Sequence, residues 1–286
     1  MASVALIVAT VSLVAMPLLA RRVRAAFRPV ELTRYNAVTM SSGVVLLCIA
    51  LVVCAVPVIV AVGGGSMLNR HFFPGSSIVG WFSAITAVTL IVTMGIGYRR
   101  VRKVEDRLRI EPSVGVHFTL AGHELVVLSA HQPLAYAIGG HHPQVVITDG
   151  LLEQLSVPEL VSVVEHEAAH LSLNHRLHLT LVGMLEPVAS WFFPTRWLVD
   201  ALASALEHAA DSQTTDWFAT RRALLAISGA PAVAGVAAFT AGNLVDRLDA
   251  LGGHQATPDT PIRTLMYASA MMLGGISLTT LVVFWL

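Results

Sequence analysis

Four stretches of the chain contain no charged residue and are long enough to cross a bilayer as helices, which takes about 20 residues. The whole chain is 55% hydrophobic and only 13% charged, whereas a soluble domain carries about 25% charged residues. We therefore predict a polytopic, mainly α-helical membrane protein. Its four transmembrane helices are expected near residues 2–20, 37–62, 78–98 and 264–286.

The basic residues predict the orientation of these helices. Arginines cluster between the first two stretches, and arginines and a lysine follow the third at 99–109, whereas the loop between the second and third stretches has only Arg70. Positively charged loops stay in the cytoplasm, so both termini are expected outside and residues 99–263 inside. A cleaved signal peptide is the alternative for residues 2–20, but the basic residues follow that stretch instead of preceding it.

Residues 99–263 have the length of one domain, and their pattern predicts an α+β arrangement. Ser156 and Glu159 form a capping-box pattern at the start of a helix that we expect to continue to Pro187. A further helix is expected from about Arg196 to Ile227, followed by an Ala-rich helical hairpin; a membrane-embedded segment is the alternative for 223–240. Runs rich in β-branched residues predict a small antiparallel sheet at 116–121, 124–130, 134–138 and 144–148.

The sequence VVEHEAAHLSLNH, residues 163–175, carries the pattern H-E-x-x-H inside the first of these helices. His166 and His170 are four residues apart, so their imidazoles lie one turn apart on one face and can bind one tetrahedral zinc ion. Glu167 lies beside the open position of such a site and can act as general base toward the attacking water. The pattern predicts a zinc peptidase site, with Glu167 as its catalytic residue.

A site of this type needs a third protein ligand. The metzincin pattern would require Gly at 173 and His at 176, where this chain has Leu173 and Arg176, so that class is excluded. Glu207, in the later sequence ALEHAAD, is the expected third ligand. Asp211 lies on the same helix face, and we expect it to orient a ligand histidine. Solvent-exposed charges are the alternative for this acidic pair.

These motifs, together with PLAYAIGGHHPQVVITDGLL (133–152) and WFFP (191–194), resemble the BlaR/MecR-type integral-membrane zinc metallopeptidases of bacteria, which are gluzincins. The resemblance covers the order of three membrane helices, a cytoplasmic zincin-like domain and a fourth membrane helix. It implies one Zn²⁺ per chain, held by His166, His170 and Glu207, in a multi-pass protein of the bacterial cytoplasmic membrane.

Two comparisons refine this resemblance. The antibiotic-sensing members carry an extracellular penicillin-binding domain after the fourth helix, and because this chain stops at Leu286 we expect it to lack that sensor. HtpX-type membrane proteases share H-E-x-x-H and a later E-x-x-x-D but place membrane helices between the two motifs. Residues 171–206 include Pro187, Pro194, Arg196 and Asp200, and they leave no room for two spans. The BlaR/MecR type is therefore favoured.

The expected function is a membrane-anchored zinc endopeptidase that cleaves a cytoplasmic protein, such as a transcriptional repressor, or cleaves itself. Expected partners are this substrate, membrane lipids and a separate sensor or regulatory membrane protein. No nucleic acid is expected, because the basic residues at 99–109 are assigned to lipid headgroups. An HtpX-like quality-control protease and a non-catalytic membrane assembly subunit are the alternatives. We expect an extended substrate to add as a strand to a sheet edge formed by Leu134, Ala135, Tyr136, Ala137 and Ile138.

Overall fold

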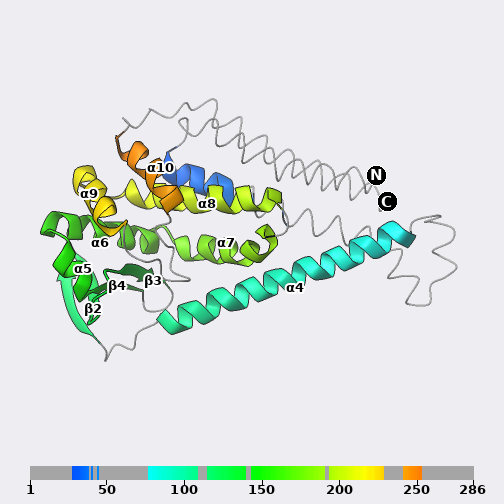
Figure 1. Cartoon of the computed structure of the whole chain (residues 1–286), viewed down its shortest axis with the longest axis horizontal. Coiled ribbons are helices and arrows are strands. Elements are labelled where there is room, and N and C mark those ends of the chain that lie inside the picture. The colour runs from blue at the N-terminus through cyan, green and yellow to red at the C-terminus, as the bar shows by residue number, and fades with distance from the viewer. Residues whose placement is uncertain are drawn as a thin grey trace.

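The computed structural model describes residues 28–38, 40, 44, 77–108, 115–139, 143–190, 193–228 and 241–252. The expected membrane helices at 2–20 and 264–286, and most of 37–62, lie outside them. Residues 29–38 are helical. The strands are β1 (Val116–Leu120), β2 (His123–Leu128), β3 (Ala135–Ile138) and β4 (Gln144–Thr148). The other helices, shown in Figure 1, are α4 (Ser77–Leu108), α5 (Asp149–Gln154), α6 (Val157–Ser172), α7 (His175–Ala189), α8 (Phe193–Asp211), α9 (Trp217–Ile227) and α10 (Ala241–Gly252).

The four strands form one mixed sheet in the order β1-β2-β4-β3. The β1–β2 and β3–β4 pairs are antiparallel, whereas β2 and β4 are parallel. The strand positions agree with the sequence prediction, but the expected purely antiparallel sheet is wrong. β3 forms the edge of the sheet. β4 lies between β2 and β3, antiparallel to β3 and parallel to β2. This order leaves β3 at one edge of the sheet.

The central strands are buried on both faces. In β4, Val145 and Ile147 pack against α5, α6 and α9, whereas Val146 between them packs with Tyr136 and Ile138 of β3 on the opposite face. This alternation is the two-residue period of a strand. Apolar packing on the sheet therefore fixes the position of α6, the helix that carries the H-E-x-x-H pattern.

The long helix predicted from Ser156 is divided in the structure. The capping box formed by Ser156 and Glu159 is present, but the helix ends at Ser172 and α7 begins at His175. The break lies at Asn174, whose φ of 52° is in the left-handed region. Asn tolerates this conformation better than most residues because its short polar side chain can hydrogen-bond locally. The chain therefore changes direction four residues after His170.

Pro187, where we expected the first helix to end, lies inside α7 and does not end it. The second predicted long helix is divided as well. The helix predicted from Arg196 to Ile227 is instead α8 and α9, separated by residues 212–216. Asp216 caps the new helix by accepting a hydrogen bond of 3.0 Å from the Ala219 backbone N–H, which is the usual role of Asp at a helix start.

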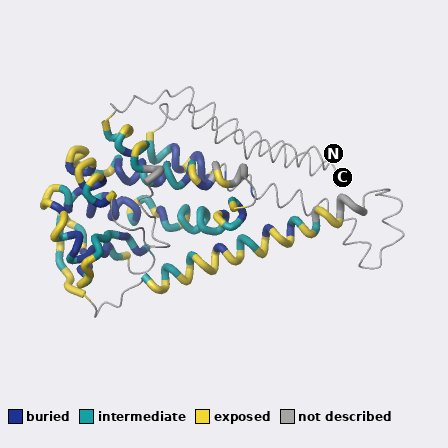
Figure 2. The backbone as a smooth tube through the Cα atoms, viewed as in Figure 1, coloured by how far each residue is buried: buried dark blue, intermediate teal, exposed yellow. Residues whose placement is uncertain are grey.

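One described helix, α4, is long and apolar enough to span a membrane, over Ala84–Leu108, and it overlaps the predicted span at 78–98. Only 17% of its apolar window is buried. Exposed residues recur along its length in Figure 2. Large apolar patches exposed to water are rare on soluble proteins, so this surface is a weak sign of membrane association. Its exposed apolar residues include Trp81, Phe82, Ile85, Val88, Ile91, Val92 and Ile96.

α7 packs on another side of α4, and α8 packs on α7 (Figure 1). Gly97 and Gly183 permit a close crossing, since a Cβ atom at Gly97 would lie 2.5 Å from the Gly183 carbonyl oxygen. Arg176 of α7 also donates two hydrogen bonds of 2.9 Å to Glu105 of α4. The apolar cluster that joins α4, α7, α8 and the helical residues near 29–44 contains Ala37, Met40, Val44, Ala87, Leu90, Leu185, Val188, Val199, Leu202 and Leu206.

Candidate metal centre

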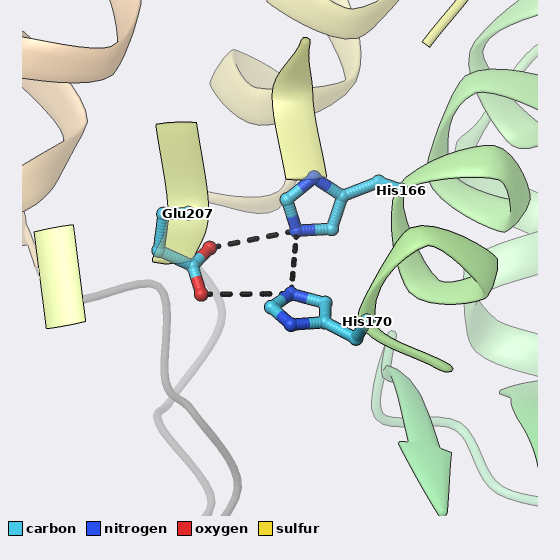
Figure 3. Close-up of side chains that lie close together, drawn as sticks. All are labelled: His166, His170 and Glu207. Atoms are coloured by element: carbon cyan, nitrogen blue, oxygen red, sulfur yellow. Dashed lines mark hydrogen bonds and ion pairs between the residues drawn. The ribbon is translucent and has the colours of Figure 1, made fainter. Parts of the chain in front are cut away.

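α6 and α8 bring together three of the predicted site residues, His166, His170 and Glu207, as Figure 3 shows. The Nε2 atoms of the two histidines are 3.2 Å apart. The Glu207 carboxylate oxygens lie 3.5 Å from Nε2 of His166 and 3.6 Å from Nε2 of His170. A tetrahedral zinc ion with bonds of about 2.0–2.2 Å separates its ligand atoms by roughly 3.3–3.5 Å. The two imidazoles and the carboxylate therefore fit zinc in donor type and in spacing.

Each histidine is held at its other ring nitrogen. Asp211 Oδ1 lies 2.9 Å from Nδ1 of His166, which is the contact expected of an orienting acidic residue. Nδ1 of His170 lies 2.8 Å from Nδ1 of His175, the first residue of α7. A ligand histidine that binds metal through Nε2 carries its proton on Nδ1, and a partner there fixes the ring and the tautomer. Both rings therefore present Nε2 to the site.

Arg247 of α10 completes the charged surroundings of the site and was not predicted from the sequence. Its guanidinium donates two hydrogen bonds to Asp211, of 2.8 Å and 2.6 Å, and one of 2.9 Å to Glu207 Oε2. Only 2% of Arg247 is exposed. The arginine belongs to a stripe with Leu244, Leu248 and Leu251 at helical spacing. In the sequence, the sign that Arg247 has a role at the site is a single basic residue within an apolar stripe.

The two histidines differ in protonation because their partners differ. Burial lowers the pKa of His170 to about 4, so this ring is neutral and ready to act as a ligand. Burial also acts to lower the pKa of His166, but hydrogen bonds to Asp211 and Glu207 outweigh it and raise this pKa to about 9. In the metal-free protein, His166 therefore carries a proton that a metal ion must displace.

Glu167 is 7% exposed on α6. Burial raises the pKa of its carboxyl to about 7, and a hydrogen bond from the Ala137 backbone acts in the opposite direction. The preceding acid, Glu165, has a different role. It accepts hydrogen bonds of 2.8 Å from the Thr215 backbone N–H and 2.9 Å from the Thr215 hydroxyl, so it ties α6 to the turn after α8 and lies outside the metal-binding group.

The predicted substrate-binding residues form the strand nearest to Glu167. Ala135–Ile138 is the edge strand β3, and Leu134 precedes it; its carbonyl accepts a hydrogen bond of 3.1 Å from the Thr148 backbone N–H. Tyr136 and Ile138 pack on the far face of the sheet, so Ala135 and Ala137 face α6. Their small side chains allow the strand to approach α6 closely enough for the Ala137 backbone to reach Glu167.

The middle of the sequence is similar to a known peptidase family. Residues 98–239 match the model of Peptidase family M48. The match supports a zincin-type metallopeptidase, and therefore a hydrolase of peptide bonds. Metallopeptidases of family M48 are typically zinc-dependent, in agreement with the His166, His170 and Glu207 group. The match does not confirm the BlaR/MecR type. No curated protein and no solved structure matches the chain.

The M48 match ends at residue 239 and so contains every residue predicted for the metal centre. Arg247 lies beyond it. Among the residues that the structure describes, the His-His-Glu group is the one cluster with the donors and spacing for a metal ion.

Proposed function

We propose that this chain is a membrane-anchored zinc endopeptidase that cleaves a cytoplasmic protein. The observation that carries the proposal is the group formed by the buried His166 and His170 and the partly buried Glu207, next to Glu167, within the segment that matches Peptidase family M48. Zinc supplies Lewis acidity toward the scissile carbonyl and toward water. The residues of the chain hold the metal and move the proton.

Glu167 is suited to that proton transfer. A general base works best when its pKa is near the operating pH, and burial places the pKa of Glu167 at about 7. The carboxylate accepts a proton from the attacking water and passes it to the leaving amine. The hydrogen bond from Ala137 holds the carboxyl next to β3, where we place the substrate backbone.

β3 supplies an edge to which an extended peptide can add by backbone hydrogen bonding. Because the strand contacts the substrate in the ground state and in the transition state alike, substitutions along Ala135–Ile138 should raise KM more than they lower kcat. The reverse pattern would remove β3 from the substrate-binding site.

The exposed apolar face of α4 supports the membrane anchor. The basic residues at 99–109, which follow that face along the chain, support a cytoplasmic location for the metal centre. Regulated cleavage of a repressor or of the chain itself is the role that we favour, as in the BlaR/MecR type. An HtpX-like quality-control protease is the second candidate. The M48 match supports a metallopeptidase but does not select the BlaR/MecR type. A non-catalytic subunit is disfavoured, since a scaffold needs no buried general base.

The test is cleavage of a peptide library by the detergent-purified, zinc-loaded chain, read by mass spectrometry. Wild-type protein and the matched variant Glu165→Gln should cleave internal peptide bonds. Glu167→Gln should cleave about 10²–10⁴-fold more slowly than wild type. If all three proteins bind zinc and none cleaves any peptide, the non-catalytic reading replaces the peptidase. Extraction of cell membranes with alkaline carbonate tests the anchor, since an integral protein stays with the lipid.

A further inference from the structure

Arg247 connects α10 to the metal centre through two acidic residues at once. Its Nε and one terminal nitrogen hold Asp211, and the other terminal nitrogen holds Glu207. The two acids are one turn apart on α8, so a single planar guanidinium bridges consecutive turns. Lysine cannot reproduce this arrangement, because its ammonium is a single point of charge.

The contacts place each acid between Arg247 and a ligand histidine. Arg247 donates to Oε2 of Glu207, which also lies 3.5 Å from Nε2 of His166, whereas Oε1 lies 3.6 Å from Nε2 of His170. On Asp211, Oδ1 is shared between Arg247 and Nδ1 of His166, at 2.6 Å and 2.9 Å. The guanidinium thus fixes the rotamer of one metal ligand directly, and it fixes the ring of another through Asp211.

The charge of Arg247 matters as much as its shape. A buried and a partly buried carboxylate on adjacent turns repel each other and lose hydration, so they need a counter-ion. The nearby histidines cannot serve permanently, because each must be neutral to bind a metal ion. An arginine side chain remains protonated at any physiological pH. It can compensate the two acids without competing for the metal.

We propose that Arg247 is a positioning residue of the metal centre: it holds Glu207 and Asp211 in the geometry that binds the metal ion, and so makes α10 a required part of the site. This inference rests on the proposed zinc site but goes beyond it. Arg247 acts through the ligands and does not itself coordinate the metal. The rival explanation is an ion pair that only attaches α10 to α8.

The experiment measures the zinc dissociation constant of the full-length, detergent-purified chain by competition with a chromophoric chelator. The variants are Arg247→Lys and Arg247→Gln. The matched control is Arg176→Lys, which disrupts the two hydrogen bonds of 2.9 Å between α7 and Glu105, a contact in which no metal ligand takes part. Thermal unfolding of the metal-free proteins shows which of them are folded. Arg247→Lys serves as the milder variant, because it keeps a positive charge near the acids.

The expected result is a graded loss of zinc affinity. Residues that orient metal ligands typically contribute 10- to 100-fold to affinity. We expect Arg247→Lys to bind zinc at least tenfold more weakly than wild type, Arg247→Gln more weakly still, and Arg176→Lys within twofold of wild type. If folded Arg247→Lys binds zinc like wild type, or loses no more affinity than Arg176→Lys, the positioning role is overturned. If wild type binds no zinc, the proposed function fails together with this inference.

Discussion

The two ends of α8 lie in opposite surroundings. Val199, Leu202 and Leu206 are buried in the apolar cluster with α4 and α7. The partly buried Glu207 and the buried Asp211, which follow them, lie among histidines and an arginine. At the apolar end, shape and volume decide the contacts. At the polar end, every charge has a defined partner. We therefore expect changes at the polar end to alter metal binding, and changes at the apolar end to alter stability alone.

The largest expected effect at the polar end is a dependence on pH. The pKa of His166 is raised from the usual 6.5 to about 9 in the metal-free protein. Protonation of His166 therefore stabilises the folded metal-free protein fully below about pH 6.5, and this stabilisation is lost as the pH rises through 9. Zinc must displace this proton. Apparent zinc affinity should rise about tenfold per pH unit well below pH 9, roughly 50-fold in all from pH 7 to pH 9, and then level off. Chelator competition at several pH values measures it, and a flat profile would contradict the protonation of His166.

Asp211→Asn removes the acid that orients His166. Zinc affinity should fall about 10- to 100-fold, and the rise in affinity between pH 7 and pH 9 should become smaller, because the His166 proton loses its strongest partner. Asp200→Asn is the matched control, since Asp200 is an exposed acid on the same helix. Equal affinities for the two variants would break the distinction between the ends of α8.

His175→Phe removes the partner of His170 Nδ1 while it keeps the ring volume in a site that is 1% exposed. Zinc affinity should fall about tenfold, the lower end of the range for residues that orient ligands. His178→Phe, whose ring centroid lies 6.2 Å from that of His175, should leave the affinity unchanged. Isothermal titration of the metal-free proteins with zinc compares them. A normal affinity for His175→Phe would show that His170 needs no partner.

The smallest effect on zinc is expected at the apolar end. Leu202 is fully buried, so Leu202→Ala should reduce the free energy of unfolding by about 2–5 kcal/mol and leave the zinc affinity of the folded protein within twofold of wild type. Leu177→Ala, at a residue 66% exposed, should change stability by less than about 0.5 kcal/mol. Denaturant unfolding, followed with and without zinc, separates the two quantities. A tenfold loss of affinity in Leu202→Ala would show that the two ends are coupled.

The same contrast explains what the sequence could predict. His166, Glu167 and His170 follow from helical spacing alone, and Glu207 with Asp211 follows from the chemistry that this group needs. His175 did not follow, because on an uninterrupted helix it would point about 140° away from His170. The left-handed Asn174 redirects the chain, and no helical periodicity contains that turn.

The remaining surprises come from contacts that are distant in sequence. Arg247 of α10 contacts Asp211 of α8, which lies 36 residues earlier in the chain. The sequence sign of this contact was a single arginine within an apolar stripe. The sheet order was likewise hidden, because strand patterns specify β3 and β4 but not which of them lies beside β2. The metal-binding group was predictable from its chemistry, whereas the contact of α10 with α8 and the order of the strands were not.

The central claim is that α6 and α8 together bind one zinc ion, and zinc content measured by mass spectrometry on the detergent-purified chain tests it most directly. Wild type should hold about one zinc per chain, Glu167→Gln should retain it, and Glu207→Ala should lose most of it. Wild-type protein without zinc, or Glu207→Ala with as much zinc as wild type, would contradict the account.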